Sequence, residues 1–147
     1  MKSVMRVHVR APYERIFRLA AEIERWPERL PHYRYVRPLP APDGVRHFAM
    51  GARRGPIPVA WAAVQRPLPE DRRIEFRHTG GVTRGMEVAW RFEPDGDGWD
   101  VSIEHHLELR WPLIGAFAAE RVIGPQFIDA IAGRTLRTIK GLAEAGT

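Results

Sequence analysis

Alternating hydrophobic and polar residues in the C-terminal third of the chain predict a β-strand with two unlike faces. Strand residues repeat with a period of two, so side chains between Trp99 and Leu109 divide into two sets. The apolar set contains Val101, Ile103, His105, Leu107 and Leu109. The polar set contains Ser102, Glu104, His106, Glu108 and Arg110. We expect the first face to be covered by other elements and the second to contact water.

A helical pattern after this strand predicts the covering element, from about Gly115 nearly to the end of the chain. At about 100° per residue, one side of this helix is mostly apolar: Ile128, Ile131, Ala132, Thr135, Leu136, Ile139, Leu142 and Ala143. Phe127, Arg134 and Thr138 fall on one flank. Gly124 and Pro125 are expected to divide a shorter lead-in, Gly115 to Ile123, from the main helix.

The remaining pattern predicts strands joined by short turns. Residues 2–9 alternate as a first strand, a helix opens at Ala11-Pro12, and a second short helix or turn spans residues 26–31. Further strands are expected at residues 33–38, 45–52, 57–66, 73–78 and 84–93, and their Gly, Pro and Asp turns favour antiparallel pairing. The prediction is an α+β fold: a curved antiparallel sheet of about seven strands around a long C-terminal helix, in one domain over residues 1–147.

Composition narrows the class of protein. The chain has 147 residues, of which 44% are hydrophobic and 28% charged, values typical of a globular domain. No apolar run approaches the ~20 residues of a membrane span, and no apolar block follows Lys2 as a signal peptide would require. The lack of cysteine excludes disulfides and thiolate metal sites and leads us to expect a cytoplasmic location.

The basic residues are numerous but dispersed. The net charge is +5, and only Arg53-Arg54 and Arg72-Arg73 are adjacent pairs. A nucleic-acid binder more often gathers arginines on one helix or stripe, so we expect a solvated surface and no DNA partner. Weak association with RNA, a ribosome or an anionic membrane surface stays open.

Three stretches, taken with the order of elements, resemble one superfamily. They are residues 11–17, residues 23–33 and residues 127–132, and the most specific is Arg25-Trp26-Pro27 followed by Leu30-Pro31-His32-Tyr33. Over essentially the whole chain, the sequence resembles the START-like (SRPBCC) superfamily, in the branch of polyketide cyclase/dehydrases and coenzyme Q-binding proteins. The resemblance implies a helix-grip (START/Bet v 1-like) fold with an internal cavity. It does not fix one activity, because members include cyclases, quinone carriers and a ribosome-association toxin.

Apolar residues at alternating strand positions are the candidates for the cavity wall. Those from the strands are Trp61, Phe76, Met86, Val88, Trp90, Ile103 and Leu107; those from the helix are Phe127 and Ile131, with Arg134 on its flank. Ligand pockets are mostly apolar with a few placed polar groups. The same residues also fit a filled core, in which methionine occupies irregular gaps.

The candidate polar groups of such a cavity are two histidines and a tyrosine. His105 shares a face with Ile103 and Leu107, and His78 shares a face with Phe76, although each also fits a core histidine with a polar partner. Tyr33 matches the position at which the resemblance implies a cavity tyrosine acting with an arginine in aromatase/cyclases, and Arg134 is our choice for that partner. A phenol donates to a carbonyl or enolate oxygen, and a guanidinium stabilises the charge that develops. Tyr33 and His105 are therefore the candidate catalytic residues.

Other chemistries have little support. His105 and His106 point to opposite faces of a strand, so they do not close one metal site, and we predict no metal and no cofactor. There is no Gly-x-Ser-x-Gly motif and no phosphate-binding loop. We predict that the protein binds a hydrophobic or aromatic small molecule: a polyketide, an isoprenoid quinone or a lipid. The alternatives are a polyketide cyclase, aromatase or dehydratase, and a ribosome- or protein-binding module. We expect a monomer or a homodimer.

Overall fold

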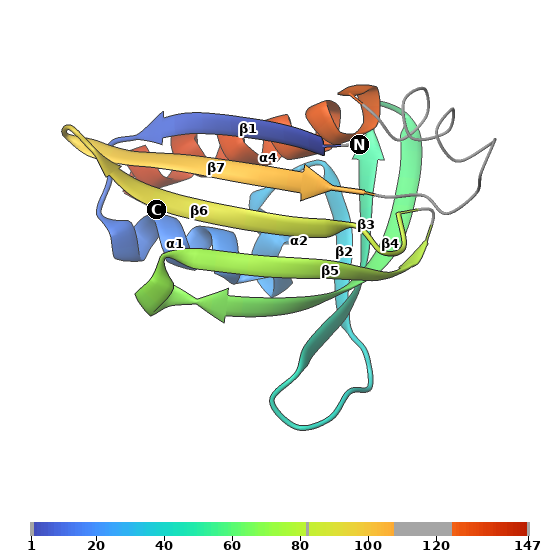
Figure 1. Ribbon diagram of the computed structural model, residues 1–147. Coiled ribbons are helices and arrows are strands. Elements are labelled where there is room, and N and C mark those ends of the chain that lie inside the picture. The colour runs from blue at the N-terminus through green and yellow to red at the C-terminus, as the bar shows by residue number, and fades with distance from the viewer. Residues whose placement is uncertain (1, 82, 108–124, 147) are drawn as a thin grey trace.

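A seven-stranded antiparallel sheet is the main element of the computed structural model (Figure 1). The structure describes residues 2–81, 83–107 and 125–146, with the backbone alone for residues 125–129. The order across the sheet is β1-β7-β6-β5-β4-β3-β2. In chain order, the strands are β1 (Lys2–Val9), β2 (Tyr33–Pro38), β3 (Arg46–Arg54), β4 (Ile57–Leu68), β5 (Arg73–Gly81), β6 (Glu87–Asp95) and β7 (Gly98–His106). Among these described strands, only β1 and β7 pair out of sequence, so the first strand closes against the last.

The long helix α4 (Pro125–Glu144) lies against the inner side of this sheet and contacts β1, β3 and α1. In Figure 1, β1, β7, β6 and β5 run across the view whereas β2 and β3 run nearly upright, so the sheet curves around the helix. Register shifts at Tyr33/Tyr35 in β2 and at Ala62/Ala63 in β4 mark bulges, which bend a strand locally. The predicted α+β helix-grip fold is confirmed, and α4 begins at the predicted Gly124-Pro125 division.

Two short helices follow β1, as the sequence predicts. They are α1 (Tyr13–Ala21) and α2 (Trp26–Arg29), with the 3-10 turn η1 (Ile23–Arg25) between them; a further turn, η2 (Pro69–Asp71), joins β4 to β5. Pro12 caps α1 in an extended conformation, which its ring favours. The indole N–H of Trp26 donates to the carbonyl of Leu19 at 2.9 Å. This bond fixes α2 against α1 and leaves the Trp26 ring in the core.

The two faces of β7 differ largely as the alternation predicts. Val101, Ile103 and His105 are buried, and His106 is exposed. Ser102 is the exception, because it is only 9% exposed although it lies on the polar face. Its cross-strand neighbours are Arg6 and Arg91, and their long side chains flank the small serine on both sides.

Two neighbouring strands, β5 and β6, differ from their predicted bounds. β5 extends to Gly81, because Gly80 and Gly81 pair with Ala62 and Trp61, while β6 begins only at Glu87. Leu109, Trp111–Ile114 and the lead-in Gly115–Ile123 lie outside the described residues. Within the part of the chain that the structure describes, no helix has both the length and the apolarity needed to cross a membrane.

Candidate functional site

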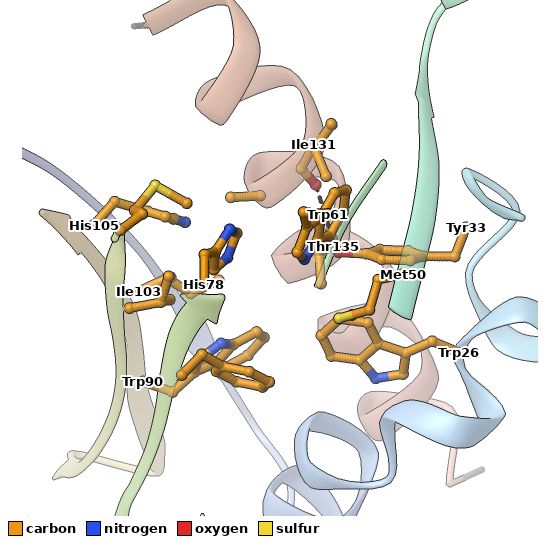
Figure 2. Close-up of a pocket in the computed structure, with 14 residues that line it drawn as sticks. Trp26, Tyr33, Met50, Trp61, His78, Trp90, Ile103, His105, Ile131 and Thr135 are labelled. Atoms are coloured by element: carbon orange, nitrogen blue, oxygen red, sulfur yellow. Dashed lines mark hydrogen bonds between the residues drawn. The ribbon is translucent and has the colours of Figure 1, made fainter. Parts of the chain in front are cut away.

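A pocket of about 80 Å³ lies between the sheet and α4 (Figure 2). Each strand from β2 to β7 contributes at least one lining residue. Helices α2 and α4 contribute the others, apart from Met86, which directly precedes β6. Its described lining residues are Trp26, Tyr33, Met50, Trp61, Phe76, His78, Met86, Val88, Trp90, Ile103, His105, Ile131, Ala132 and Thr135. The wall is therefore built by residues far apart in the chain, which the curved sheet brings to one side of the helix.

Ten of the residues that the sequence selects for a cavity meet at this pocket. They are Tyr33, Trp61, Phe76, His78, Met86, Val88, Trp90, Ile103, His105 and Ile131. The period-two rule selected the strand residues, since a strand that faces a helix must point alternate side chains toward it. Their functional roles remain predictions.

Two selected residues lie outside the pocket lining, and a third cannot be compared. Arg134 is exposed and is not among the lining residues, so our choice of it as the cavity arginine is wrong. Its position on the helix flank turns the guanidinium to water, which avoids burying an unpaired charge. Leu107 is buried in the core at 1% exposure but is not among the lining residues. The side chain of Phe127 lies outside the described residues.

Sequence reasoning missed four lining residues: Trp26, Met50, Ala132 and Thr135. Signals existed for three of them: Ala132 and Thr135 fall on the predicted apolar side of the helix, and Met50 follows the period-two pattern of its strand. Met50 alternates with Phe48 and Ala52 on β3, and all three are buried. Trp26 gave no periodic signal, since its place depends on how α2 packs against the core.

Aromatic rings, the two imidazoles included, belong to seven of the fourteen described lining residues. The Trp26 ring lies 4.8 Å from the Tyr33 ring and 6.2 Å from the Trp90 ring, measured between centroids. Trp61 and His78 are stacked nearly parallel, with centroids 5.8 Å apart and planes inclined by 2°. Flat, polarisable surfaces of this kind suit contact with planar rings.

His78 and His105 are neighbouring histidines held in their neutral form. Both are 7% exposed. Burial lowers the pKa of His105 to about 4. Burial, and secondarily repulsion from a charged His105, lowers the pKa of His78 to about 3. At neutral pH the pair therefore presents two uncharged imidazoles to the pocket.

The two imidazoles differ in their hydrogen bonding. His78 Nδ1 lies 2.6 Å from Thr83 Oγ1, so that ring is fixed. His105 Nδ1 is buried and has no hydrogen-bond partner among the described residues. Figure 2 shows the nitrogen-bearing side of His105 turned toward His78 and the pocket. An unpaired buried polar atom is costly, so a polar partner for this nitrogen would stabilise the folded protein.

Tyr33 belongs to a second polar group on the opposite side of the pocket. Burial raises the pKa of its phenol well above the usual value, and a side-chain hydrogen bond with Thr135 partly opposes this effect. Thr135 Oγ1 in turn lies 2.8 Å from His32 Nε2 and 2.8 Å from the carbonyl oxygen of Ile131. Burial, aided by the nearby charge of Arg134, lowers the pKa of His32 to about 4, so His32 is also neutral.

The described lining contains no Asp, Glu, Lys or Arg. Within the described residues, no group of three His, Cys, Asp or Glu side chains is arranged to hold a metal ion. The site can therefore bind, orient and exchange protons with a ligand through Tyr33, His78, His105 and Thr135. The described part of its lining offers no fixed charge to an ionic ligand.

Comparison with known proteins agrees with this architecture. A family model described as polyketide cyclase / dehydrase and lipid transport matches residues 9–127. The actinorhodin polyketide synthase bifunctional cyclase/dehydratase of Streptomyces coelicolor is 27% identical over 148 residues, which cover 97% of this chain and 44% of that protein. The chain thus spans less than half the length of this curated relative.

Solved structures share the fold at lower identity. TTHA0849 from Thermus thermophilus has a TM-score of 0.81 at 20% identity, covering 100% of this chain and 99% of that one. The ZhuI aromatase/cyclase from Streptomyces sp. R1128 has a TM-score of 0.81 at 17% identity, covering 98% and 93%. A START superfamily protein from Mycobacterium smegmatis has a TM-score of 0.76 at 16% identity, covering 99% of both chains. These likenesses establish the START-like fold.

Proposed function

Since the chain belongs to the polyketide cyclase/dehydrase and lipid transport family, we propose that it binds a neutral, mainly aromatic small molecule in the pocket between the sheet and α4. The single observation that carries this proposal is the lining, which is aromatic and apolar apart from four uncharged polar side chains. A polyketide is the ligand class that we favour, because the curated relative is a polyketide synthase cyclase/dehydratase.

The lining disfavours charged ligands. A carboxylate or phosphate placed there loses its water and finds no cationic side chain among the described lining residues. A neutral ring system keeps its dispersion contacts with Trp61, Trp90 and Trp26 and directs its few oxygens to His105 and Tyr33.

The volume of the pocket sets a further condition. About 80 Å³ is less than the roughly 300–1,000 Å³ of pockets that hold drug-sized ligands. A multi-ring ligand therefore needs side chains to move. Met50 and Met86 are the side chains suited to this, because an unbranched thioether changes rotamer at little cost.

The test of binding uses a substitution that fills the pocket. Ala132→Leu adds three carbon atoms at a lining position on α4, and Ala130→Leu, at a half-buried position on the same helix outside the lining, is the matched control. We expect ligand that copurifies with the wild type in native mass spectra to be lost in Ala132→Leu and kept in Ala130→Leu. The mass of the copurified ligand also distinguishes a polyketide from a quinone or a lipid. Equal retention by both variants would place the ligand elsewhere and overturn the proposal.

A second candidate function is cyclisation or dehydration of the bound polyketide, favoured by His105 Nδ1, which has no hydrogen-bond partner within the part of the chain that the structure describes. A neutral imidazole can take a proton from carbon between two carbonyl groups and return it to a departing hydroxyl. Tyr33 would hold the substrate oxygen by a hydrogen bond. With a poly-β-ketone analogue, His105→Ala and Tyr33→Phe should lower turnover by roughly 10²- to 10⁴-fold with a smaller change in affinity. Unchanged turnover would remove both residues from the mechanism.

A further inference from the structure

Successive turns of the sheet lie at opposite ends of its strands, and the two ends differ in charge. Strands β2 to β7 pair in chain order, so the β2–β3, β4–β5 and β6–β7 turns share one end. The β3–β4 and β5–β6 turns share the other end. Exposed acids gather around the first set of turns, with Arg72 as a base among them: Asp43, Glu70, Asp71, Asp95 and Asp97.

The second set of turns carries arginines instead. Arg53 and Arg54 close β3, Arg84 lies in the β5–β6 turn, and Arg134 lies in the first half of α4. Arg54 is half-buried and the other three are exposed. We call these four residues the basic end. Glu87, which begins β6, is an exposed acid beside them, so the basic end keeps an excess of positive charge.

Two contacts show that Arg53 and Arg134 are neighbours in the fold. The backbone N–H of Arg53 donates to the carbonyl of His32 at 2.7 Å. Burial lowers the pKa of His32 to about 4, and the nearby charge of Arg134 adds to this effect. Helix α4 contacts β3, and Figure 1 shows the start of α4 next to the β3–β4 turn at the upper right. Arginines that are dispersed in the sequence are therefore gathered by the fold.

An exposed apolar side chain accompanies these arginines. Ile57 begins β4, pairs with Arg54 across the β3–β4 turn and is 55% exposed. Pro56 and Pro58 on either side of it are also exposed. Gly55 turns the chain with a φ of +57°, so the turn is tight and holds Ile57 near its tip. Cations around an apolar tip are typical of surfaces that enter the head-group region of an anionic membrane.

The pocket lies toward the same end of the molecule. Ile131 and Ala132 line it from the first half of α4, and His78 and Met86 line it on either side of the β5–β6 turn. A membrane in contact with the basic end would therefore adjoin the pocket. A neutral, mainly apolar ligand dissolves in the bilayer core, because apolar surface is favourably removed from water.

We propose that the basic end docks on an anionic phospholipid membrane, with its arginines at the head-group phosphates and Ile57 among the upper acyl chains. The acids at the opposite end disfavour docking in the reverse orientation. The apolar tip favours a membrane over a soluble polyanion such as RNA, which offers no acyl chains to Ile57. This inference goes beyond the proposed function, because it concerns a surface outside the pocket.

Cosedimentation with lipid vesicles tests the charge. We expect the wild type to bind vesicles of phosphatidylcholine with phosphatidylglycerol, to bind pure phosphatidylcholine less, and to be released by salt. Arg53→Gln should lower the partition coefficient about 5-fold, the effect of one basic residue at an anionic surface. Arg37→Gln is the matched control, because Arg37 is exposed on β2 next to the turn at the opposite end. It should bind like the wild type.

A fluorescent label tests the contact of the apolar tip. The chain has no cysteine, so Ile57→Cys and Val45→Cys each create a single site for an environment-sensitive dye. Val45 is 46% exposed and lies in the β2–β3 turn at the opposite end. On anionic vesicles, the dye emission should shift to shorter wavelength for Ile57→Cys and stay unchanged for Val45→Cys. Both positions are exposed, so neither substitution removes a core contact.

The outcomes separate the possible occupants. Equal binding of the wild type to both kinds of vesicle, or equal losses in Arg53→Gln and Arg37→Gln, would overturn the docking surface. Salt-sensitive binding without a dye shift for Ile57→Cys would overturn the membrane as the occupant and assign the arginines to a soluble polyanion. Ligand retention in native mass spectra does not depend on these results, so the binding function stands or fails separately.

Discussion

Replacing His105 with leucine should make the protein less sensitive to acid. The pKa of an unperturbed histidine is 6.5, and burial lowers that of His105 to about 4 in the folded protein. Between these values the unfolded chain binds more protons than the folded chain. The free energy of unfolding therefore rises with pH through this window, and the stabilisation is lost as pH falls.

The magnitude follows from the two pKa values. Between about pH 7.5 and about pH 5, the differential protonation of His105 removes about 2 kcal/mol of the free energy of unfolding. His78, with a pKa lowered to about 3, removes a similar amount. His78 keeps most of this contribution in the His105→Leu variant, because burial is the larger cause of its low pKa. Over this pH range, the free energy of unfolding of His105→Leu should therefore fall by about 2 kcal/mol less than that of the wild type.

Urea denaturation followed by circular dichroism at the two pH values gives the required free energies. The control is His106→Leu, the same substitution at the next residue of β7, where the ring is exposed. The control should show the wild-type loss between the two pH values. If His105→Leu loses as much stability as the wild type, the imidazole is not held neutral by burial, and its place in an apolar pocket is refuted.

Two further substitutions test packing outside the pocket. Gly51→Ala should destabilise the protein by about 1–3 kcal/mol, because a Cβ there would meet the Tyr35 ring, and thermal denaturation should show partial recovery when Tyr35→Ala is added. Gln65→Leu should cost about 1–3 kcal/mol, because the Gln65 amide donates to the carbonyl of Ala21 at 2.9 Å and accepts from Arg46 at 2.7 Å. A loss of less than about 0.5 kcal/mol in urea denaturation would show that water replaces these partners.

The strand side of the pocket could be predicted from the sequence because it depends on a local rule. Alternation places His105 between Ile103 and Leu107 on one face, and the curvature of the sheet does not change which face that is. The same rule does not say which residues along that face are near enough to the pocket to line it. Leu107 therefore shares the face of His105 but is not among the residues that line the pocket.

The helix side was less predictable because the depth at which α4 sits in the sheet is a tertiary property. The helical projection gave the sides correctly, with Thr135 on the apolar side and Arg134 on the flank. It did not show that the flank would be exposed, and so it allowed Arg134 to be chosen for the cavity. A long charged side chain at such a boundary turns to water whenever the backbone permits it.

The polar character of the site depends on contacts that no local pattern contains. His32 and Thr135 are 103 residues apart in the chain, and their hydrogen bond exists only because α4 packs beside the start of β2. The resemblance singles out Tyr33 through its motif, and the structure places Tyr33 in the pocket lining together with Thr135, which no motif indicated. A motif can therefore point to a residue of the pocket lining, whereas the polar groups around that residue are brought together only by the packing of distant elements.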